Sequence, residues 1–215
     1  MHPTEPGTPT MNVDRFAHKA DSYELNRSRV ENVACIAESI LRAIEFRRSM
    51  HIVDFGSGTG LLLERIAPHV GKITAIDISG SMNRQLEQKR QELTCALDIL
   101  ETDLEKAAVP FRVDGIVSSM TMHHIADIEA MFRKFHSMLN GGGFIAIADL
   151  DTEDGSFHTE DTGVFHHGFD REVFSRAAIN AGFESVETSS ASVVHKPQGS
   201  FGVFLLTATR SADQD

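Results

Sequence analysis

Residues 54–60 combine an acidic side chain with three closely spaced glycines. They read DFGSGTG, with Asp54 inside the β-prone run HIVDF and the helix-forming stretch LLLERI directly after the last glycine. Glycine allows backbone angles and close approaches that a Cβ blocks. A strand that turns through such residues into a helix presents backbone N–H groups at the edge of a sheet where open α/β folds bind ligands. The turn is therefore a candidate ligand cradle, and the alternative is a tight connection without a ligand.

Two more carboxylates follow strand-like runs. ITAIDIS places Asp77 at the end of one run, and ILETDLEK places Asp103 after the next. A carboxylate accepts two hydrogen bonds at once and so suits a vicinal diol. Asp77 has the alternative role of a helix cap before Ser79. Because ligands of open α/β sheets bind at the carboxyl ends of the strands, both carboxylates are expected near the glycine turn.

The segments that must position these residues alternate between strand-like and helical patterns of apolar residues. The short strand-like runs lie at 51–55, 72–78, 96–100, 114–120 and 143–149. Helices are predicted between and after them, at about 59–67, 80–93, 125–139 and 170–181. Two strands, 184–195 and 201–209, follow, separated by the hairpin sequence KPQGS. This alternation predicts an α/β fold with a mostly parallel seven-stranded sheet, helices on both faces and one antiparallel strand in an edge hairpin.

Length, composition and charge restrict the remaining possibilities. The 215 residues are expected to form a disordered tail at 1–10 and a single domain at 11–215, which begins with a helical lid at 11–46 broken near Tyr23. A net charge of −11 argues against nucleic-acid or membrane partners. No membrane-spanning run or signal peptide is found, so a cytoplasmic location is expected. Cys35 and Cys95 are interpreted as buried, reduced thiols.

The glycine turn resembles the first motif of class I S-adenosylmethionine-dependent methyltransferases. VDFGSGTG carries the spacing G-x-G-x-G behind a strand aspartate, and the resemblance extends over about residues 51–150. A dinucleotide fingerprint would need glycine where the chain has Leu61. The resemblance implies a three-layer Rossmann-like sandwich that binds S-adenosyl-L-methionine. It also implies transfer of the methyl group to an O, S or N nucleophile of a small molecule by in-line displacement.

The same resemblance implies roles for individual residues. Asp54 supports the glycine loop and the methionine moiety, Asp77 binds the ribose hydroxyls, and Asp103 accepts a hydrogen bond from the adenine amino group. Loop positions, hydroxyls and apolar side chains complete the implied cofactor contacts: Tyr23, Gly56, Ser57, Gly58, Gly60, Ile78, Met82, Leu104, Ser119 and Met120. Substrate selection is implied for residues 12–30 and 150–170, which carry Phe16, Tyr23, Arg27, Phe157, Phe165 and Phe169.

Histidines in the loops at this edge are the candidates for a general base. Alignment of the reactants supplies much of the acceleration in a displacement reaction, so a thiol or phenol acceptor needs less base help than an alcohol. Histidine has an unperturbed pKa of about 6.5 and suits the role, although each one could be an ordinary surface residue. The catalytic candidates are His123, His124, His166 and His167, with His158 nearby. Histidines and acids of residues 151–168 match no metal motif, so no metal is expected.

Two other functions remain open at this point. A nicotinamide-dependent oxidoreductase could use the same turn with Asp77 on the adenosine ribose, but Leu61 opposes this reading. A non-catalytic module that binds S-adenosylmethionine is the second alternative. A general base must lie within hydrogen-bond reach of the proton it removes, and the sequence alone does not name a residue that does so. In either case the expected partner is a small molecule, and the chain is expected to be a monomer or homodimer.

Overall fold

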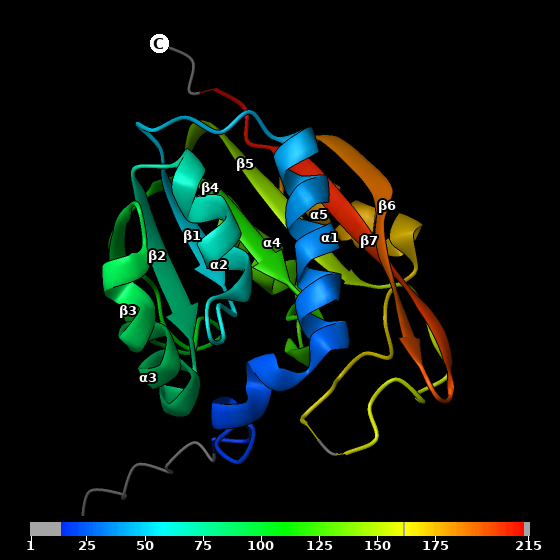
Figure 1. Cartoon of the computed structure of the whole chain (residues 1–215). Coiled ribbons are helices and arrows are strands. Elements are labelled where there is room, and N and C mark those ends of the chain that lie inside the picture. Colours follow the sequence, from blue (N-terminus) through cyan, green and yellow to red (C-terminus); the bar gives the residue numbers. More distant parts are fainter. Residues whose placement is uncertain (1–13, 161, 213–215) are drawn as a thin grey trace, which may run out of the picture.

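The computed structural model, which describes residues 14–160 and 162–212, is built on a seven-stranded sheet with the order β3-β2-β1-β4-β5-β7-β6 (Figure 1). The strands are β1 (His51–Phe55), β2 (Lys72–Asp77), β3 (Ala96–Glu101), β4 (Val113–Ser119), β5 (Leu139–Leu150), β6 (Glu184–Lys196) and β7 (Gly199–Thr209). Strands β1 to β5 pair in parallel, and β7 is antiparallel to both β5 and β6. The predicted α/β fold is confirmed. The tail predicted at residues 1–10 lies outside the described residues.

Helices cover both faces of this sheet (Figure 1). One face carries α1 (Arg27–Ala43), α2 (Leu61–Ile66) and α3 (Gly80–Lys89), and the other carries α4 (Ile128–Met138) and α5 (Arg171–Asn180). Each side has its own apolar core, with Ile36 and Leu63 fully buried on the first and Phe132 and Phe135 on the second. Among the described residues, no helix is long and apolar enough to cross a bilayer.

Polar side chains fix where the helices begin. Asn26, Ser79 and Asp127 each precede a helix, and their side chains accept hydrogen bonds from the backbone N–H groups of the first turns of α1, α3 and α4. Such caps satisfy N–H groups that have no partner inside the helix. Because Ser79 caps α3 directly after β2, this helix begins beside the end of that strand.

The strand order creates a crevice beside the carboxyl end of β1. From β1 the chain moves outward to β2 and β3 and then returns to the other side of β1 as β4. Phe55 lies in register with Ile76 on one side and with Ser118 on the other, so the three strands end together. Ligands of open α/β sheets bind where the strand order reverses in this way.

Some local expectations are corrected. The first part of the N-terminal lid is a short 3-10 helix, η1 (Ala20–Leu25), and the break falls at Asn26, whose backbone is extended because it caps α1. Helix α1 ends at Ala43, so the predicted helix is too long. The interpretation of both cysteines as buried is wrong: Cys35 is exposed on the outer side of α1, and Cys95 is half-buried.

Candidate functional site

A cavity of about 570 Å³ lies at the carboxyl ends of β1 to β4. This volume is within the range of about 300–1,000 Å³ that is typical of small-molecule sites. Residues at or just after the strand ends form its floor, including Gly56, Asp77, Asp103 and Ser119. Its cover comes from three segments that are far apart in sequence: residues 16–33, residues 157–160 with Thr162, and residues 194–197. The predicted ligand edge of the sheet is thus hollow and partly covered.

The glycine turn shapes the cavity because its glycines carry no Cβ atoms. Gly56, Gly58 and Gly60 all have positive φ angles, of 69°, 54° and 91°. A Cβ on Gly56 would come within 2.2 Å of the Thr121 hydroxyl, whereas a Cβ on Gly58 would meet nothing within 4 Å. Gly58 lines the cavity, so the space beside its Cα is open for a ligand. Gly60 does not line it and instead precedes α2.

The amide groups of the turn are not free in the way the sequence interpretation supposed. The N–H of Gly56 donates to the Ile76 carbonyl at 2.8 Å, and the N–H of Gly60 donates to the Ser57 carbonyl at 2.9 Å. The N–H of Gly58 donates to a carboxylate oxygen of Asp77 at 2.8 Å. Helix α2 also has only six residues. The turn therefore lets a ligand approach the glycine Cα atoms closely. It does not present a row of unpaired backbone N–H donors.

Asp77 combines the two roles that the sequence left open. Its carboxylate accepts hydrogen bonds from the backbone N–H groups of Gly58 and Ser79, both at 2.8 Å, and Ser79 is the cap of α3. It also lines the cavity. Burial raises its pKa above the ordinary value, while the bonds from the two amides oppose that rise. Asp77 thus holds the glycine turn against α3 and faces the ligand space.

Asp54 lies behind the turn and does not line the cavity. It is 1% exposed, and its Oδ2 atom has no hydrogen-bond partner among the described residues. Burial, and then the nearby charge of Asp77, raise the pKa of Asp54 to about 8. At neutral pH this carboxyl is therefore mainly protonated. A buried acceptor of this kind is costly unless a donor or a positive charge comes to it.

One end of the cavity is apolar, with carboxylates close by. Met82 and Leu104 line this end and are 2% and 1% exposed, and Ile78 lines it from a more exposed position. Asp103 lines the same region and pairs with Lys106 at 2.7 Å. Ser119 and Met120 continue the lining after β4. Met120 has a φ of 56°, a left-handed conformation that is uncommon for a side chain other than glycine.

The lid is tied to the site by a contact that sequence patterns do not reveal. Asp14 accepts hydrogen bonds from the Ser79 hydroxyl at 2.8 Å and from the Ser81 N–H at 3.0 Å. The lid then contributes Phe16 and Tyr23 to the cavity lining. Asp14 lies 65 residues before Ser79, and nothing in its local sequence distinguishes it from any other surface aspartate. The predicted proximity of Tyr23 to the cofactor edge agrees with its place in the lining.

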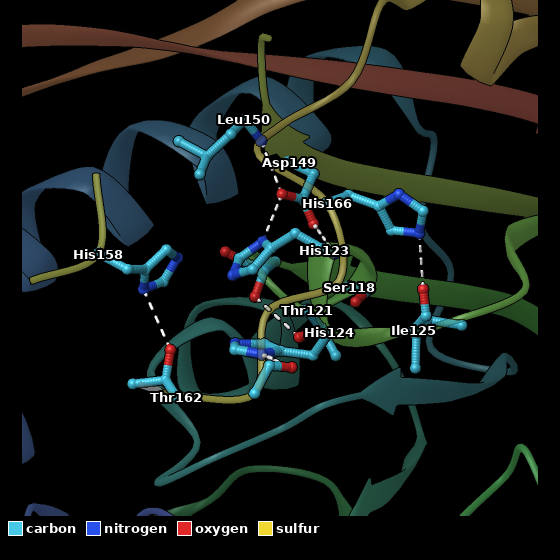
Figure 2. Close-up of polar contacts among 12 residues, drawn as sticks. Ser118, Thr121, His123, His124, Ile125, Asp149, Leu150, His158, Thr162 and His166 are labelled. Atoms are coloured by element: carbon cyan, nitrogen blue, oxygen red, sulfur yellow. Dashed lines mark hydrogen bonds and ion pairs between the residues drawn. The ribbon is translucent and has the colours of Figure 1, made fainter. Parts of the chain in front are cut away.

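His123 forms the most enclosed polar contact of the site (Figure 2). It lies in the 3-10 helix η4 (Met122–His124) after β4, and its Nδ1 is 2.6 Å from Oδ1 of Asp149 near the end of β5. His123 is 2% exposed and lines the cavity, whereas Asp149 is fully buried. Burial alone would raise the pKa of Asp149, but the His123 ring and the N–H of Leu150 hold it below the ordinary value.

Two further histidines stand beside His123. The ring centroids of His124 and His158 lie 4.3 Å and 5.1 Å from that of His123, and both rings line the cavity. Burial, and then the neighbouring His123, lower the pKa of His124 to about 4 and that of His158 to about 3. Both are therefore neutral at neutral pH. The Nε2 atom of His158 is buried without a hydrogen-bond partner among the described residues.

The other two catalytic candidates lie away from the cavity. Nε2 of His166 donates to the Ile125 carbonyl at 2.9 Å (Figure 2), and His167 is exposed beside Gly155. Neither lines the cavity: His166 is half-buried and packs on Phe169, and only His167 faces solvent. Within the described ranges, no group of three or more His, Cys, Asp or Glu side chains is arranged to hold a metal ion.

Some predicted substrate-selecting residues also fall elsewhere. Phe16, Tyr23 and Phe157 line the cavity, whereas Arg27, Phe165 and Phe169 do not. Phe169 instead packs on Phe174 in the core below α5. The sequence reading missed several residues that do line the cavity, namely Lys19, Arg29, Asn32 and Lys196. Only the position of Arg29 and Asn32 on one face of α1 could have suggested them.

Comparison with known proteins agrees with this geometry. A family model described as a methyltransferase domain matches residues 52–143. An uncharacterized methyltransferase of Schizosaccharomyces pombe is 31% identical over 173 residues, which are 73% of this chain and 60% of that protein. The chain belongs to the class I S-adenosylmethionine-dependent methyltransferase family. It spans about 60% of the length of this methyltransferase relative.

Solved structures share the methyltransferase fold at low sequence identity. A Haloferax volcanii methyltransferase, solved in complex with a methyltransferase activator, superposes with a TM-score of 0.75 at 17% identity, covering 93% of this chain and 99% of that one. The DhpI–SAH complex superposes with a TM-score of 0.68 at 20% identity, covering 93% and 94%. These likenesses show a common fold, so the chemistry of this methyltransferase domain has to be argued from its own cavity.

Proposed function

We propose that the chain binds S-adenosyl-L-methionine in the cavity and transfers its methyl group to a small molecule. The observation that carries this proposal is the joint lining by Gly58, Asp77 and Asp103 at the carboxyl ends of neighbouring strands. The open space at Gly58 admits a ligand to the backbone, and the two carboxylates can accept hydrogen bonds from a sugar diol and an exocyclic amine. Met82 and Leu104 supply an apolar surface for a base.

The unsatisfied atoms around the cavity fit this cofactor. Behind the glycine turn, Asp54 has a buried oxygen without a partner among the described residues and a raised pKa, and a positive charge bound in the cavity would lower that pKa. Ser119 has a buried hydroxyl without a partner among the described residues. Tyr23 and the remaining cofactor candidates, Gly56, Ile78 and Met120, line the same space, while Ser57 and Gly60 lie behind it. When bound, the cofactor supplies an electrophilic methyl group on a sulfonium.

His123 is the residue best placed to take a proton from the acceptor. Nδ1 of His123 lies 2.6 Å from Oδ1 of the buried Asp149 carboxylate, and this contact fixes the orientation of the ring. Asp149 also accepts the His123 backbone N–H at 3.2 Å and the Leu150 N–H at 2.7 Å, so its position is fixed. An imidazole held in place beside the cavity can act as a general base for a hydroxyl acceptor when its Nε2 atom carries no proton.

The partial cover over the cavity supports a small acceptor. Residues from the lid, from the loop after β5 and from the β6–β7 hairpin all contribute lining side chains, so a macromolecular acceptor would have to reach past them. The Haloferax volcanii neighbour is described with an activator protein. For this chain, the monomer or homodimer state and the cytoplasmic location remain predictions. Leu61 continues to oppose the nicotinamide alternative.

A matched pair of glycine variants tests the proposal. Gly58 and Gly142 both have positive φ angles, of 54° and 79°, and a Cβ on either would meet nothing within 4 Å, but only Gly58 lines the cavity. The Gly58→Val and Gly142→Val variants should therefore show similar losses of stability by urea unfolding. Calorimetry should show S-adenosylhomocysteine binding to the unaltered protein and to Gly142→Val, and none to Gly58→Val. Equal affinity in both variants would place the ligand elsewhere.

Transfer is measured separately from binding. Labelled methyl from S-adenosylmethionine should appear on at least one compound in a panel of thiols, phenols, alcohols and amines. Binding of S-adenosylhomocysteine without any transfer would favour the non-catalytic module instead. Protection by NADH, with none by S-adenosylhomocysteine, would favour the oxidoreductase.

A further inference from the structure

Two cations that line the cavity form no ion pair with a carboxylate of the described residues. The guanidinium of Arg29 lies 3.9 Å from the centroid of the Tyr23 ring and donates to the Tyr23 carbonyl at 2.5 Å. The ammonium of Lys196 lies 3.5 Å from the centroid of the Phe157 ring and donates to the Phe157 carbonyl. No ion pair joins either cation to a described acidic side chain, although acids outnumber bases by 31 to 20 in the chain.

The charges around these cations do not neutralise them. Lys19 also lines the cavity, but it pairs with Glu160 at 2.5 Å. Glu153 faces Lys196, yet one of its oxygens accepts the backbone N–H groups of Gly155 and Phe157. Burial, and then the charge of Arg29, lower the pKa of Lys196. The repulsion between Arg29 and Lys196 therefore exceeds the attraction that Glu153 provides.

Polar groups without partners lie on the same wall. Asn32 follows Arg29 by one helical turn, lines the cavity and is 7% exposed, and its side-chain oxygen has no partner among the described residues. Ser28, on the same face of α1, also lines the cavity. The buried Nε2 of His158 is likewise unpartnered. Buried polar atoms are normally hydrogen-bonded, so these groups indicate a polar ligand at this wall.

This wall lies toward the histidines. The positive charge of Lys196 is among the causes that lower the pKa of His158, whose ring contacts those of His123 and His124. Asp77, beside the glycine turn, and Arg29 both act on the pKa of Tyr23, so Tyr23 lies near both of these charges. A group held by Arg29 and Lys196 would thus lie on the side where His123 can take a proton from an acceptor.

We propose that Arg29 and Lys196 bind a carboxylate of the methyl acceptor, so that the substrate is a small organic anion. This inference rests on the proposed function, because it assigns the substrate class of the same cavity. The planar guanidinium matches a carboxylate in two parallel hydrogen bonds, and the ammonium adds a point charge. The Nδ2 amide group of Asn32 can donate a further hydrogen bond to the carboxylate. The other source of the same chemistry is the amino-acid carboxylate of the cofactor.

The test uses protein saturated with S-adenosylhomocysteine, so that the cofactor carboxylate already has its place. Matched pairs of carboxylic acids and their amides serve as probes: 4-hydroxybenzoate, 3-(4-hydroxyphenyl)propanoate and 3-mercaptopropanoate, each against its amide. Calorimetry should show at least one acid binding about tenfold or more tightly than its neutral amide. The preference should disappear in Arg29→Gln and Lys196→Gln and persist in Lys196→Arg.

Arg27→Gln is the matched control. Arg27 is on the same helix, its side chain is 90% exposed, it pairs with Glu31 at 2.7 Å and it does not line the cavity. Its removal changes the net charge equally and should leave the acid-to-amide ratio unchanged. An equal loss of the acid-to-amide preference in this control would mean that the net charge of the protein causes the preference, and not contact with Arg29 and Lys196.

Three results would overturn the inference. The first is equal binding of acid and amide, or no binding of either, in every pair. The second is a loss of S-adenosylhomocysteine affinity in Arg29→Gln and Lys196→Gln with an unchanged acid-to-amide ratio, which would assign these cations to the cofactor. The third is the equal loss in Arg27→Gln. Failure of S-adenosylhomocysteine to bind the unaltered protein at all would instead overturn the proposed function.

Discussion

Replacement of Asp54 by asparagine should change how the stability of the protein depends on pH. The pKa of this carboxyl is raised from 3.8 to about 8 in the folded chain, chiefly by burial. Between these pH values the unfolded chain is ionised at this position and the folded chain is protonated, so folding takes up a proton. The free energy of unfolding therefore falls as pH rises, by up to about 1.4 kcal/mol per pH unit.

The magnitude follows from this slope. Over the two units between about pH 5 and about pH 7, Asp54 should cost the folded state roughly 3 kcal/mol. Asparagine has the same shape and does not ionise, so Asp54→Asn should gain that amount relative to the unaltered protein over the same interval. The pKa values of His124 and His158 are lowered in the folded chain, so their contribution to the free energy of unfolding is lost as pH falls below about 6.5. This contribution is the same in both proteins and cancels when they are compared.

Urea unfolding of both proteins without ligand, at about pH 5, 6 and 7, measures this difference. Asp98→Asn is the control, because Asp98 pairs with Lys72 at the surface and its pKa is lowered. A lowered carboxyl pKa affects stability only in more acidic solution, so this control should run parallel to the unaltered protein across the interval. Parallel curves for Asp54→Asn as well would refute the assignment of a raised pKa to Asp54.

Three other predictions concern binding, catalysis and the core. Asp77→Ala should weaken S-adenosylhomocysteine binding by about 1–3 kcal/mol in calorimetry and also lower stability, because the Gly58 and Ser79 amides lose their acceptor; unchanged affinity would contradict the site. His123→Ala should slow transfer to an alcohol acceptor by about 10²–10⁴-fold without changing cofactor affinity, with a smaller loss for a thiol, and equal losses for both would contradict its role as a base. Phe132→Ala should lower the free energy of unfolding by about 3–5 kcal/mol, since this fully buried ring packs on Phe135 and Phe174. A loss below about 1 kcal/mol in urea unfolding would contradict that packing.

Local patterns predicted the elements well because each strand and helix carries its own period. The run HIVDF is β1 with the predicted bounds, and the alternation after it is present in the sheet. The predicted bounds are wrong where strand pairing, and not the local sequence, sets the end of an element. Strand β5 begins at Leu139 rather than 143, because Leu139 pairs with Val113 across an irregular register. The exposed side of Cys35 likewise depends on which face of α1 meets the sheet.

The sequence by itself determined the glycine turn and the carboxylates that end or follow β2 and β3, because glycine conformations and strand ends are local properties. Only the tertiary structure brought Asp149 to His123, 26 residues away, and Arg29 of α1 near Lys196 of the hairpin. It also left His166 and His167 outside the cavity lining. These outcomes depend on how loops without a periodic pattern pack over the sheet, and that packing is set by contacts between segments distant in the chain.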